Sequence, residues 1–313
     1  MTEPFFIVGF QRSGTTLLRV MLDNHPEIAI PLDVTGLWAR YNSKLHEYNY
    51  LRTNDDVIKI IRDLLKEERI KLWQTDFSVE EILQYVEKNT YSHVIAAFYR
   101  AYANHRGKKY WGYKDPDTRH IHLLNKWFPQ SKIIHIIRDG RDACLSHLKQ
   151  DFGYDNLLVC AEAWRERVWW CRVIGQLLGS SRYFELKFED LIEHPEKELR
   201  SICNFLNISY SSHMLSYYKN IEKSIPECKR HIWRLIDKPP QKNNKNLWKQ
   251  KMSKGELICF EKRAGQLLKE LGYETLPGVP SGAYLTEIYN FFKIGFPAVK
   301  RRFGQFLVQL IRG

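Results

Sequence analysis

A short apolar strand, a glycine-bounded loop and a helix constrain the N-terminal part of this chain. Residues 5–8 are an apolar run of strand-forming side chains, and Gly9 and Gly14 bound the turn that follows. Leucine and methionine then recur at helical spacing over residues 17–22. In such a unit the loop N–H groups and the helix N-terminus point at one spot and favour an anion there. The pattern therefore predicts a phosphate-binding loop, and an unliganded glycine-rich turn is the alternative.

The loop residues indicate what kind of phosphate this is. Thr15 stands where the nucleotide-binding pattern G-x-x-x-x-G-K-[ST] has its lysine. Nucleoside-triphosphate enzymes use that lysine together with Mg²⁺ to hold the β- and γ-phosphates. In this chain the cation lies earlier in the loop, at Arg12. The loop therefore suits a single diester-like phosphosulfate better than a metal-bound triphosphate, and a triphosphate-dependent kinase or ATPase is the first alternative.

The stretch 9–18 resembles the 5′-phosphosulfate-binding loop of sulfotransferases that use 3′-phosphoadenosine 5′-phosphosulfate (PAPS), although Gln11 replaces their usual proline. Residues 19–26 resemble the tyrosylprotein sulfotransferase branch and its bacterial relatives. The resemblance implies transfer of a sulfuryl group from PAPS to a hydroxyl acceptor, with release of adenosine 3′,5′-bisphosphate (PAP) and no metal requirement. It implies that the donor is bound by Arg12, Ser13, Gly14, Thr15 and Thr16.

A second motif follows a later apolar run. Arg138 comes at the carboxyl end of residues 132–137, where doubly wound sheets bind ligands, and Ser146 lies about two helical turns further on. The resemblance implies that Arg138 and Ser146 hold the 3′-phosphate of PAPS. An arginine presents a planar fork of donors to a phosphate, and a serine adds one short hydrogen bond. For Arg138 alone, a salt bridge at the strand end is the alternative.

Two further residues join Arg12 as the candidates for the chemistry. Lys114 aligns with the lysine of the Lys-Asp-Pro motif of the tyrosylprotein enzymes, which implies that it stabilises the bridging oxygen; the alternative is an ion pair with Asp115. Cytosolic sulfotransferases have a histidine base where this chain has Pro116. The resemblance instead implies Asp33 as the general base, in the place of a glutamate in the tyrosylprotein branch. An N-cap for the helix around Leu37 is the alternative role of Asp33.

Two later segments complete the candidate cofactor site. Phe188 stands where the family usually has a tyrosine, so it keeps ring packing and loses a hydroxyl contact. Trp248, together with Lys245 and Lys249, resembles the family's late tryptophan-centred loop, which folds over the phosphates. A solvated charge run is the alternative for this segment. Because Gln11, Asp33 and Phe188 depart from the family pattern, a degenerate enzyme that binds PAPS and turns over poorly is a further alternative.

Strands alternate with helices along the chain, which predicts an α/β fold of the P-loop type with three layers. Its central parallel sheet is expected to be covered by helices on both faces, with the strand at 28–30 beside the first strand. We expect the domain to span residues 1–280, with a helical insert at about 37–105, and an amphipathic helical tail to span 281–313. The remaining strands are expected at 110–116, 132–138 and 182–188.

The formal net charge of +12 is compatible with several kinds of partner. It suits an anionic cofactor, an anionic substrate or a membrane surface, and it also follows from a simple solubilising excess. A non-catalytic basic protein that binds nucleic acid or membranes is therefore another alternative, with a positive stripe and no cofactor-sized pocket as its signature. The sulfotransferase interpretation expects a hydroxyl-bearing acceptor, namely a small molecule, glycan, lipid or peptide, and no nucleic acid.

The cysteines and the ends of the chain bear on location. Six cysteines are scattered without metal-ligand spacing, which favours buried free thiols. The sequence lacks a secretory pattern and an uninterrupted apolar run of ~18 residues, so we predict a cytoplasmic protein. The tail at 281–313 combines an apolar side with basic residues. It predicts either peripheral contact with a membrane, or docking on its own domain or on a second subunit as a homodimer.

Overall fold

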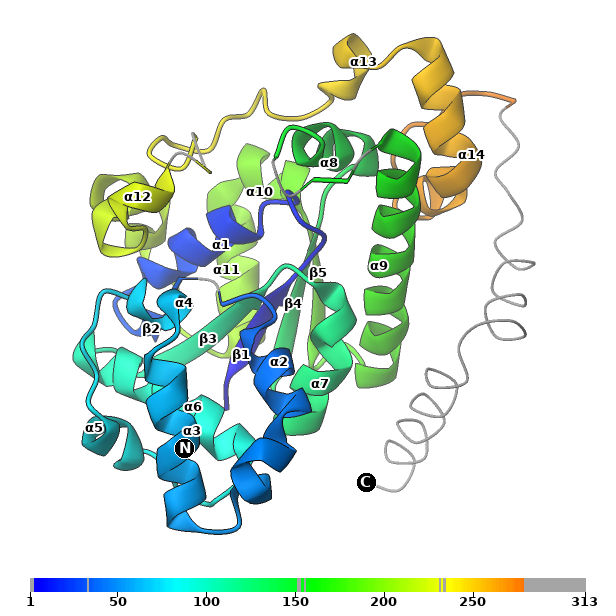
Figure 1. Ribbon diagram of the computed structural model, residues 1–313. Coiled ribbons are helices and arrows are strands. Elements are labelled where there is room, and N and C mark those ends of the chain that lie inside the picture. The colour runs from blue at the N-terminus through cyan, green and yellow to red at the C-terminus, as the bar shows by residue number, and fades with distance from the viewer. Residues whose placement is uncertain are drawn as a thin grey trace. The chain divides into compact units, whose positions relative to one another are not determined.

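The computed structural model describes residues 3–32, 34–150, 153, 154, 156–230, 232 and 235–278 (Figure 1). The chain divides into two compact units. The first unit comprises Met1–Arg138 and Arg167–Asn246, and the second comprises Asp139–Glu166 and Leu247–Gly313. The predicted tail at 281–313, and with it the boundary at residue 280, lies outside the described residues.

The first unit is built on a parallel sheet, as the alternating pattern predicted. Its described strands have the order β2-β3-β1-β4-β5. They are β1 (Phe5–Val8), β2 (Ile28–Ala29), β3 (Tyr110–Asp115), β4 (Lys132–Ile137) and β5 (Tyr183–Lys187). All four residues of β1 are buried, because this strand is central and is covered on both faces.

The expected place of β2 beside the first strand was wrong. β3 takes that side of β1, with Phe5 opposite Gly112, and β2 pairs instead with the outer side of β3, with Ile28 opposite Tyr110. With only two residues, β2 is a short edge strand, which is one way in which proteins limit exposed strand edges.

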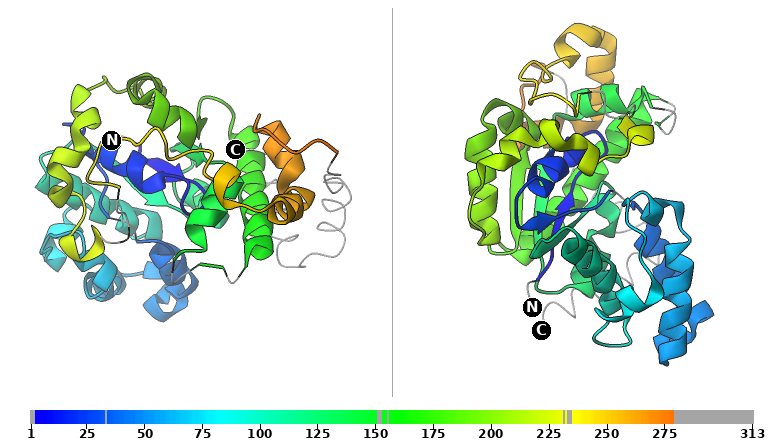
Figure 2. Two further views of the ribbon diagram at one scale, coloured as in Figure 1. Left: turned by 90° about the horizontal axis from the view of Figure 1, so that it is seen from above. Right: turned by 90° about the vertical axis from the view of Figure 1, so that its left-hand side faces the viewer.

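Helices cover both faces of this sheet, as the two directions of view in Figures 1 and 2 show. On one face lies α1 (Thr15–Asp23), toward which Lys114 of β3 points its amine. On the other face lie α6 (Tyr91–His105) and α7 (Ile121–Trp127). The ring of Tyr99 stacks there on Trp111 of β3, with centroids 5.0 Å apart. The alternation of β3 side chains therefore separates a phosphate-loop face from an aromatic core.

The predicted insert is helical, and polar caps begin two of its helices. It comprises α2 (Leu37–Ser43), η1 (Leu45–Leu51), α3 (Asn54–Leu65), α4 (Glu68–Lys71), α5 (Val79–Leu83) and α6. Thr53 and Asp56 form a capping box at α3, and Ser78 and Glu81 form another at α5. Most aromatic side chains of the insert are buried, whereas Tyr50 is exposed.

The other elements of the first unit follow the sheet strands. They are η2 (Thr118–His120), α10 (Phe188–Glu193), α11 (Pro195–Leu206), η3 (Ser212–Lys223) and α12 (Glu227–Arg230). The second unit contains α8 (Gly140–His147), α13 (Trp248–Lys251) and α14 (Lys254–Glu270). The long helix α9 (Leu157–Leu178) begins in the second unit and ends in the first. None of the helices in the described ranges has the length and apolarity that crossing a membrane requires.

The cysteines are free thiols, and the prediction of burial is confirmed for four of them. The buried thiols are those of Cys144, Cys160, Cys171 and Cys203, whereas Cys228 and Cys259 are exposed. The exposed pair departs from the prediction because Cys228 lies on the one-turn helix α12, which has no buried residue, and Cys259 lies on the outer side of α14.

Candidate active site

The phosphate loop, residues 9–16, connects β1 to α1, and two of its residues have the left-handed backbone conformation. Gly14 has φ +92° at the N-cap of α1, and Arg12 has φ +68°. A Cβ atom on Gly14 would lie 2.3 Å from the ring of Phe188, and one on Gly9 would lie 2.5 Å from the carbonyl oxygen of Ile136. Glycine is therefore required at both positions by close packing, and at Gly14 by backbone conformation as well.

The side chains of the loop form a polar cradle. The Ser13 hydroxyl is fully buried, and within the described parts of the chain its oxygen has no hydrogen-bond partner. Thr15 and Thr16 are buried at the start of α1, where the helix N-terminus carries a partial positive charge. A buried hydroxyl without a partner costs free energy, and an anion in the cradle would satisfy it.

Lys114 joins this cradle from the neighbouring strand. Its side chain is 3% exposed, and Nζ lies 3.4 Å from the Oγ1 of Thr16. Asp115, the alternative partner of Lys114, accepts hydrogen bonds from the Tyr113 hydroxyl at 2.9 Å and from His120 Nδ1 at 2.8 Å. The structure thus brings the Lys114 amine to the beginning of α1, on the same face of the sheet as the loop.

Arg138 lies against the loop in the first unit. Its Nη1 donates to the carbonyl oxygen of Arg12 at 3.2 Å, and its guanidinium stacks on the Phe188 ring with a separation of 4.5 Å. Since the same ring contacts Gly14, Phe188 lies between the loop and Arg138. Phe188, whose role was open, therefore packs as a spacer that sets the distance between two predicted cofactor-binding elements.

Sequence reasoning missed Asn244, which also holds Arg138. Arg138 Nη2 donates to the backbone oxygen of Asn244 at 2.9 Å and to its Oδ1 at 3.2 Å. The neighbouring Lys245, a predicted cofactor residue, forms an ion pair with Glu193 at the end of α10. The one available signal was the position of Asn244 within the basic segment that was predicted to close over the phosphates.

Electrostatics favour an anion beside this arrangement. Burial, and then the positive charge of Arg138, lower the pKa of Arg12 from its usual value. Two guanidinium groups that repel each other are stabilised when an anionic group lies between or beside them. With the buried Ser13 hydroxyl and the left-handed Gly14 turn, the residues of the first unit fit the phosphosulfate end of PAPS.

Two predicted residues belong to the second unit. Ser146 lies in the last turn of α8. Trp248 begins α13 and is buried, with its ring 3.6 Å from the guanidinium carbon of Arg141 and its backbone N–H donating to Asp142 at 2.8 Å. Arg141 is itself paired with Glu261 and Asp139. Within its unit, Trp248 is therefore part of a buried polar network that orders α8 and α13.

The candidate base, Asp33, lies outside the residues that the structure describes. The N-cap position of α2 is Gly36, with φ +74°. Both roles of Asp33, general base and cap of the helix around Leu37, therefore stay predictions.

Comparisons with known proteins agree with this geometry. A model of the sulfotransferase family matches residues 4–212. Protein-tyrosine sulfotransferase 2 of Gallus gallus is 26% identical over 88% of this chain and 71% of its own length. Protein-tyrosine sulfotransferase A of Caenorhabditis elegans is 26% identical over 72% of this chain and 55% of its own length. The chain thus spans 71% of the length of the first relative and 55% of the length of the second.

A solved structure supports the fold. The sulfotransferase domain from the Synechococcus PCC 7002 olefin synthase superposes with a TM-score of 0.60 at 23% identity, covering 88% of this chain and 98% of that chain. The fold and the loop therefore define an α/β protein of the phosphate-binding-loop class. Because the family match covers more than half of the sequence, the chain belongs to the sulfotransferase family. It is accordingly an enzyme of that family, and the comparisons lend no support to the kinase alternative.

Proposed function

We propose that the phosphate loop and Arg138 bind the two ends of PAPS, with Arg12, Ser13, Gly14, Thr15 and Thr16 at the phosphosulfate and Arg138 with Ser146 at the 3′-phosphate. The observation that carries this proposal is the packing of Arg138 on Phe188 and of Phe188 on Gly14. A guanidinium held in this way keeps its planar fork in a fixed orientation, which lowers the entropic cost of binding a phosphate.

Lys114 is the proposed electrostatic catalyst. PAPS supplies the sulfuryl group, and the leaving oxygen gains negative charge as that group departs. A buried ammonium beside Thr16, close to the N-terminus of α1, stabilises such charge more strongly than it would in water. Lys245 and Trp248 act in the segments that close over the cofactor.

The proposed acceptor is a hydroxyl-bearing molecule, and Asp33 is the proposed base for its proton. The names of the relatives indicate protein tyrosines as their acceptors. For this chain, a sequence identity of 26% to these relatives supports the reaction class. It does not identify the acceptor, which we expect the helical insert to select. A carboxylate that accepts the hydroxyl proton makes the oxygen more nucleophilic toward sulfur.

The cofactor assignment is tested by isothermal titration calorimetry of PAP against ATP with Mg²⁺. We expect PAP to bind and ATP–Mg²⁺ to bind weakly or not at all. Arg138→Ala should weaken PAP binding by roughly 1.5–3 kcal/mol for each charged hydrogen bond that is lost. A preference for ATP–Mg²⁺ would contradict the assignment and indicate a phosphotransferase.

The base is tested separately with Asp33→Asn. We expect transfer from [³⁵S]PAPS to be abolished while the dissociation constant of PAP stays unchanged, because the amide keeps the shape and cannot accept the proton. Turnover equal to that of the wild type would exclude Asp33 as the base.

A further inference from the structure

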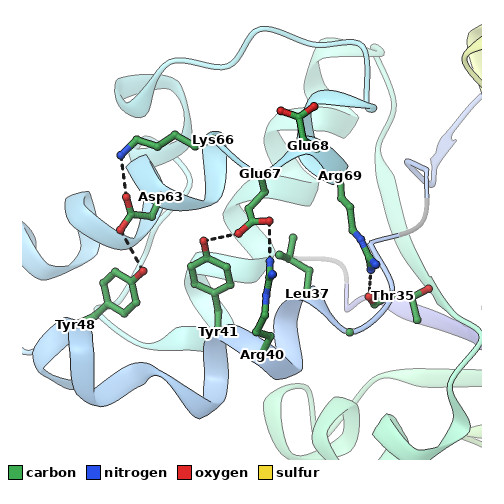
Figure 3. A pocket seen from close by; sticks show the side chains of 11 residues that line it. Thr35, Leu37, Arg40, Tyr41, Tyr48, Asp63, Lys66, Glu67, Glu68 and Arg69 are labelled. Carbon is green, nitrogen blue, oxygen red and sulfur yellow. Dashed lines mark hydrogen bonds and ion pairs between the residues drawn. The ribbon is translucent and has the colours of Figure 1, made fainter. Parts of the chain in front are cut away.

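A cavity of ≈ 690 Å³ opens within the helical insert of the first unit, among α2, η1, α3 and α4 (Figure 3). This volume is within the range of small-molecule sites. We call it the insert pocket. It is lined by Thr35, Gly36, Leu37, Arg40, Tyr41, Tyr48, Asp63, Lys66, Glu67, Glu68 and Arg69.

Two tyrosine–carboxylate–cation triplets form one wall of the insert pocket. Glu67 accepts from the Tyr41 hydroxyl at 2.7 Å and from Arg40 Nη2 at 2.6 Å. Asp63 accepts from the Tyr48 hydroxyl at 3.1 Å and from Lys66 Nζ at 2.9 Å. The two triplets lie side by side (Figure 3), and their tyrosine rings stack with centroids 6.1 Å apart.

The tyrosines hold the carboxylates in place. Burial, and then the hydrogen bond to Asp63, raise the pKa of Tyr48 to about 12, and burial and Glu67 likewise raise the pKa of Tyr41. Both hydroxyls therefore stay protonated, and each uses its one O–H group to donate a hydrogen bond to its carboxylate. The lone pairs that remain on the carboxylates, and the N–H groups that remain on Arg40 and Lys66, are left to meet a ligand.

The charges of the lining residues cancel. Arg40, Lys66 and Arg69 balance the three carboxylates, and Leu37 is the single aliphatic side chain in the lining. A neutral pocket gives no net attraction to an acidic or a basic peptide.

A neutral molecule with many hydroxyls matches this lining. Each hydroxyl can both donate and accept hydrogen bonds, so two adjacent hydroxyls can donate one hydrogen bond to a carboxylate and accept one from the cation beside it. The Arg40–Glu67 and Lys66–Asp63 pairs, with N–O separations of 2.6 and 2.9 Å, offer this combination twice.

The insert pocket is joined to the proposed reaction region by the chain itself. Thr35 and Gly36 line it, directly after residues 33 and 34, and Arg69 of α4 donates a hydrogen bond to the carbonyl oxygen of Thr35. The segment that carries the proposed base is thus attached to the wall of the pocket. β2, which precedes this segment, presents its carboxyl end to the edge where parallel sheets bind ligands.

We propose that the insert pocket binds a saccharide portion of the acceptor, remote from the hydroxyl that is sulfated. This inference rests on the proposed function, because it names the acceptor class of the same reaction. Binding of a non-reacting part of a substrate supplies free energy that orients the reacting part. A site built to hydrogen-bond hydroxyls also rejects analogues that lack them.

The test is transfer from [³⁵S]PAPS to an array of neutral oligosaccharides, with tyrosyl peptides and 4-nitrophenol in parallel. We expect labelling of an oligosaccharide. For that acceptor, Glu67→Gln and Lys66→Gln should each raise KM by about tenfold while kcat changes by less than about twofold, the signature of lost remote binding. The matched controls Glu80→Gln and Lys88→Gln lie outside the pocket and should leave both constants unchanged.

Calorimetry of PAP binding to each variant distinguishes failure of the saccharide subsite from failure of the proposed function. Lys66 is an exposed side chain, so its replacement leaves folding intact even if Glu67→Gln does not. Labelling confined to peptide or phenol, or a KM that Lys66→Gln leaves unchanged, would overturn the saccharide subsite while PAP still binds. Failure of the wild-type protein to bind PAP would overturn the proposed function instead.

Discussion

Phe188 is the residue on whose ring the guanidinium of Arg138 stacks. Its ring separates Gly14 from Arg138, and it begins α10 directly after β5 ends. The ring therefore acts twice, once by excluding any side chain at residue 14 and once by offering its face to a cation. The hydroxyl that the family usually carries here is not needed for either contact.

Phe188→Leu should weaken PAP binding without unfolding the protein. The replacement keeps an apolar side chain of similar size and removes the aromatic face under Arg138, a contact worth about 0.5–2 kcal/mol. At about 1.4 kcal/mol per factor of ten, the PAP dissociation constant should rise roughly 2- to 30-fold in calorimetry.

Phe184→Leu is the control for this substitution. Phe184 lies on β5 and its ring packs on Phe205, with centroids 5.4 Å apart. An equal loss of PAP affinity in both variants would show that the effect is a general loosening of β5 rather than the loss of the face under Arg138.

At the scale of elements, β4 and β5 share a buried histidine. His135 of β4 is fully buried, and its Nδ1 lies 2.6 Å from the hydroxyl of Tyr183 on β5. Burial, with a smaller effect of Arg172, lowers the pKa of His135 to about 3. The imidazole is therefore neutral in the folded protein across the range in which a free histidine becomes protonated.

His135 should make the sheet sensitive to acid. Below pH 6.5 the unfolded chain binds a proton at this position, whereas the folded chain does so only near pH 3. Because the unfolded state then binds more protons, the free energy of unfolding falls as the pH falls, by up to about 1.4 kcal/mol per pH unit. His135→Gln should remove this slope, measured by urea denaturation between pH 6.5 and 4.5.

The exposed His46 provides the control, since His46→Gln should unfold with the pH dependence of the wild type. If wild type and His135→Gln show parallel slopes over this range, the histidine is not held neutral by burial.

Most elements were predictable because their signals are local. The apolar run at 132–138 predicted β4, found at Lys132–Ile137. The helix α10 was missed because it follows β5 without a break, and its N-cap, Lys187, makes no side-chain cap. The partner of β2 was wrong because strand pairing depends on contacts with residues about 80 positions later, which no local pattern encodes.

In the candidate site, too, residues in local motifs were predictable, whereas contacts between distant positions were not. The loop residues, Lys114 and Arg138 were predicted from motifs, and the structure brings Arg138 and Lys114 to the phosphate loop in the first unit. Asn244 was missed because its contact with Arg138 joins positions that are 106 residues apart. The functional roles of all these residues and of Ser146, Asp33, Lys245 and Trp248, as well as the cytoplasmic location, stay predictions.

At the scale of the whole molecule, the sheet order places the first strand of the chain at its centre. β1 pairs on one side with β3 and on the other with β4, so both of its neighbours come more than 100 residues later. Topologies of this kind have high contact order and fold slowly, because distant segments must meet before their contacts form.

This order has a consequence for synthesis on the ribosome. At roughly 5–20 residues per second, the strand β4 is made about 6 to 25 s after β1. Until β3 is made the apolar segment Phe5–Val8 of the nascent chain has no partner strand on either edge, and until β4 is made it has none on the second edge. The strand that leads into the phosphate loop is thus an apolar segment that stays exposed to other nascent chains and to chaperones until the rest of the sheet has been translated.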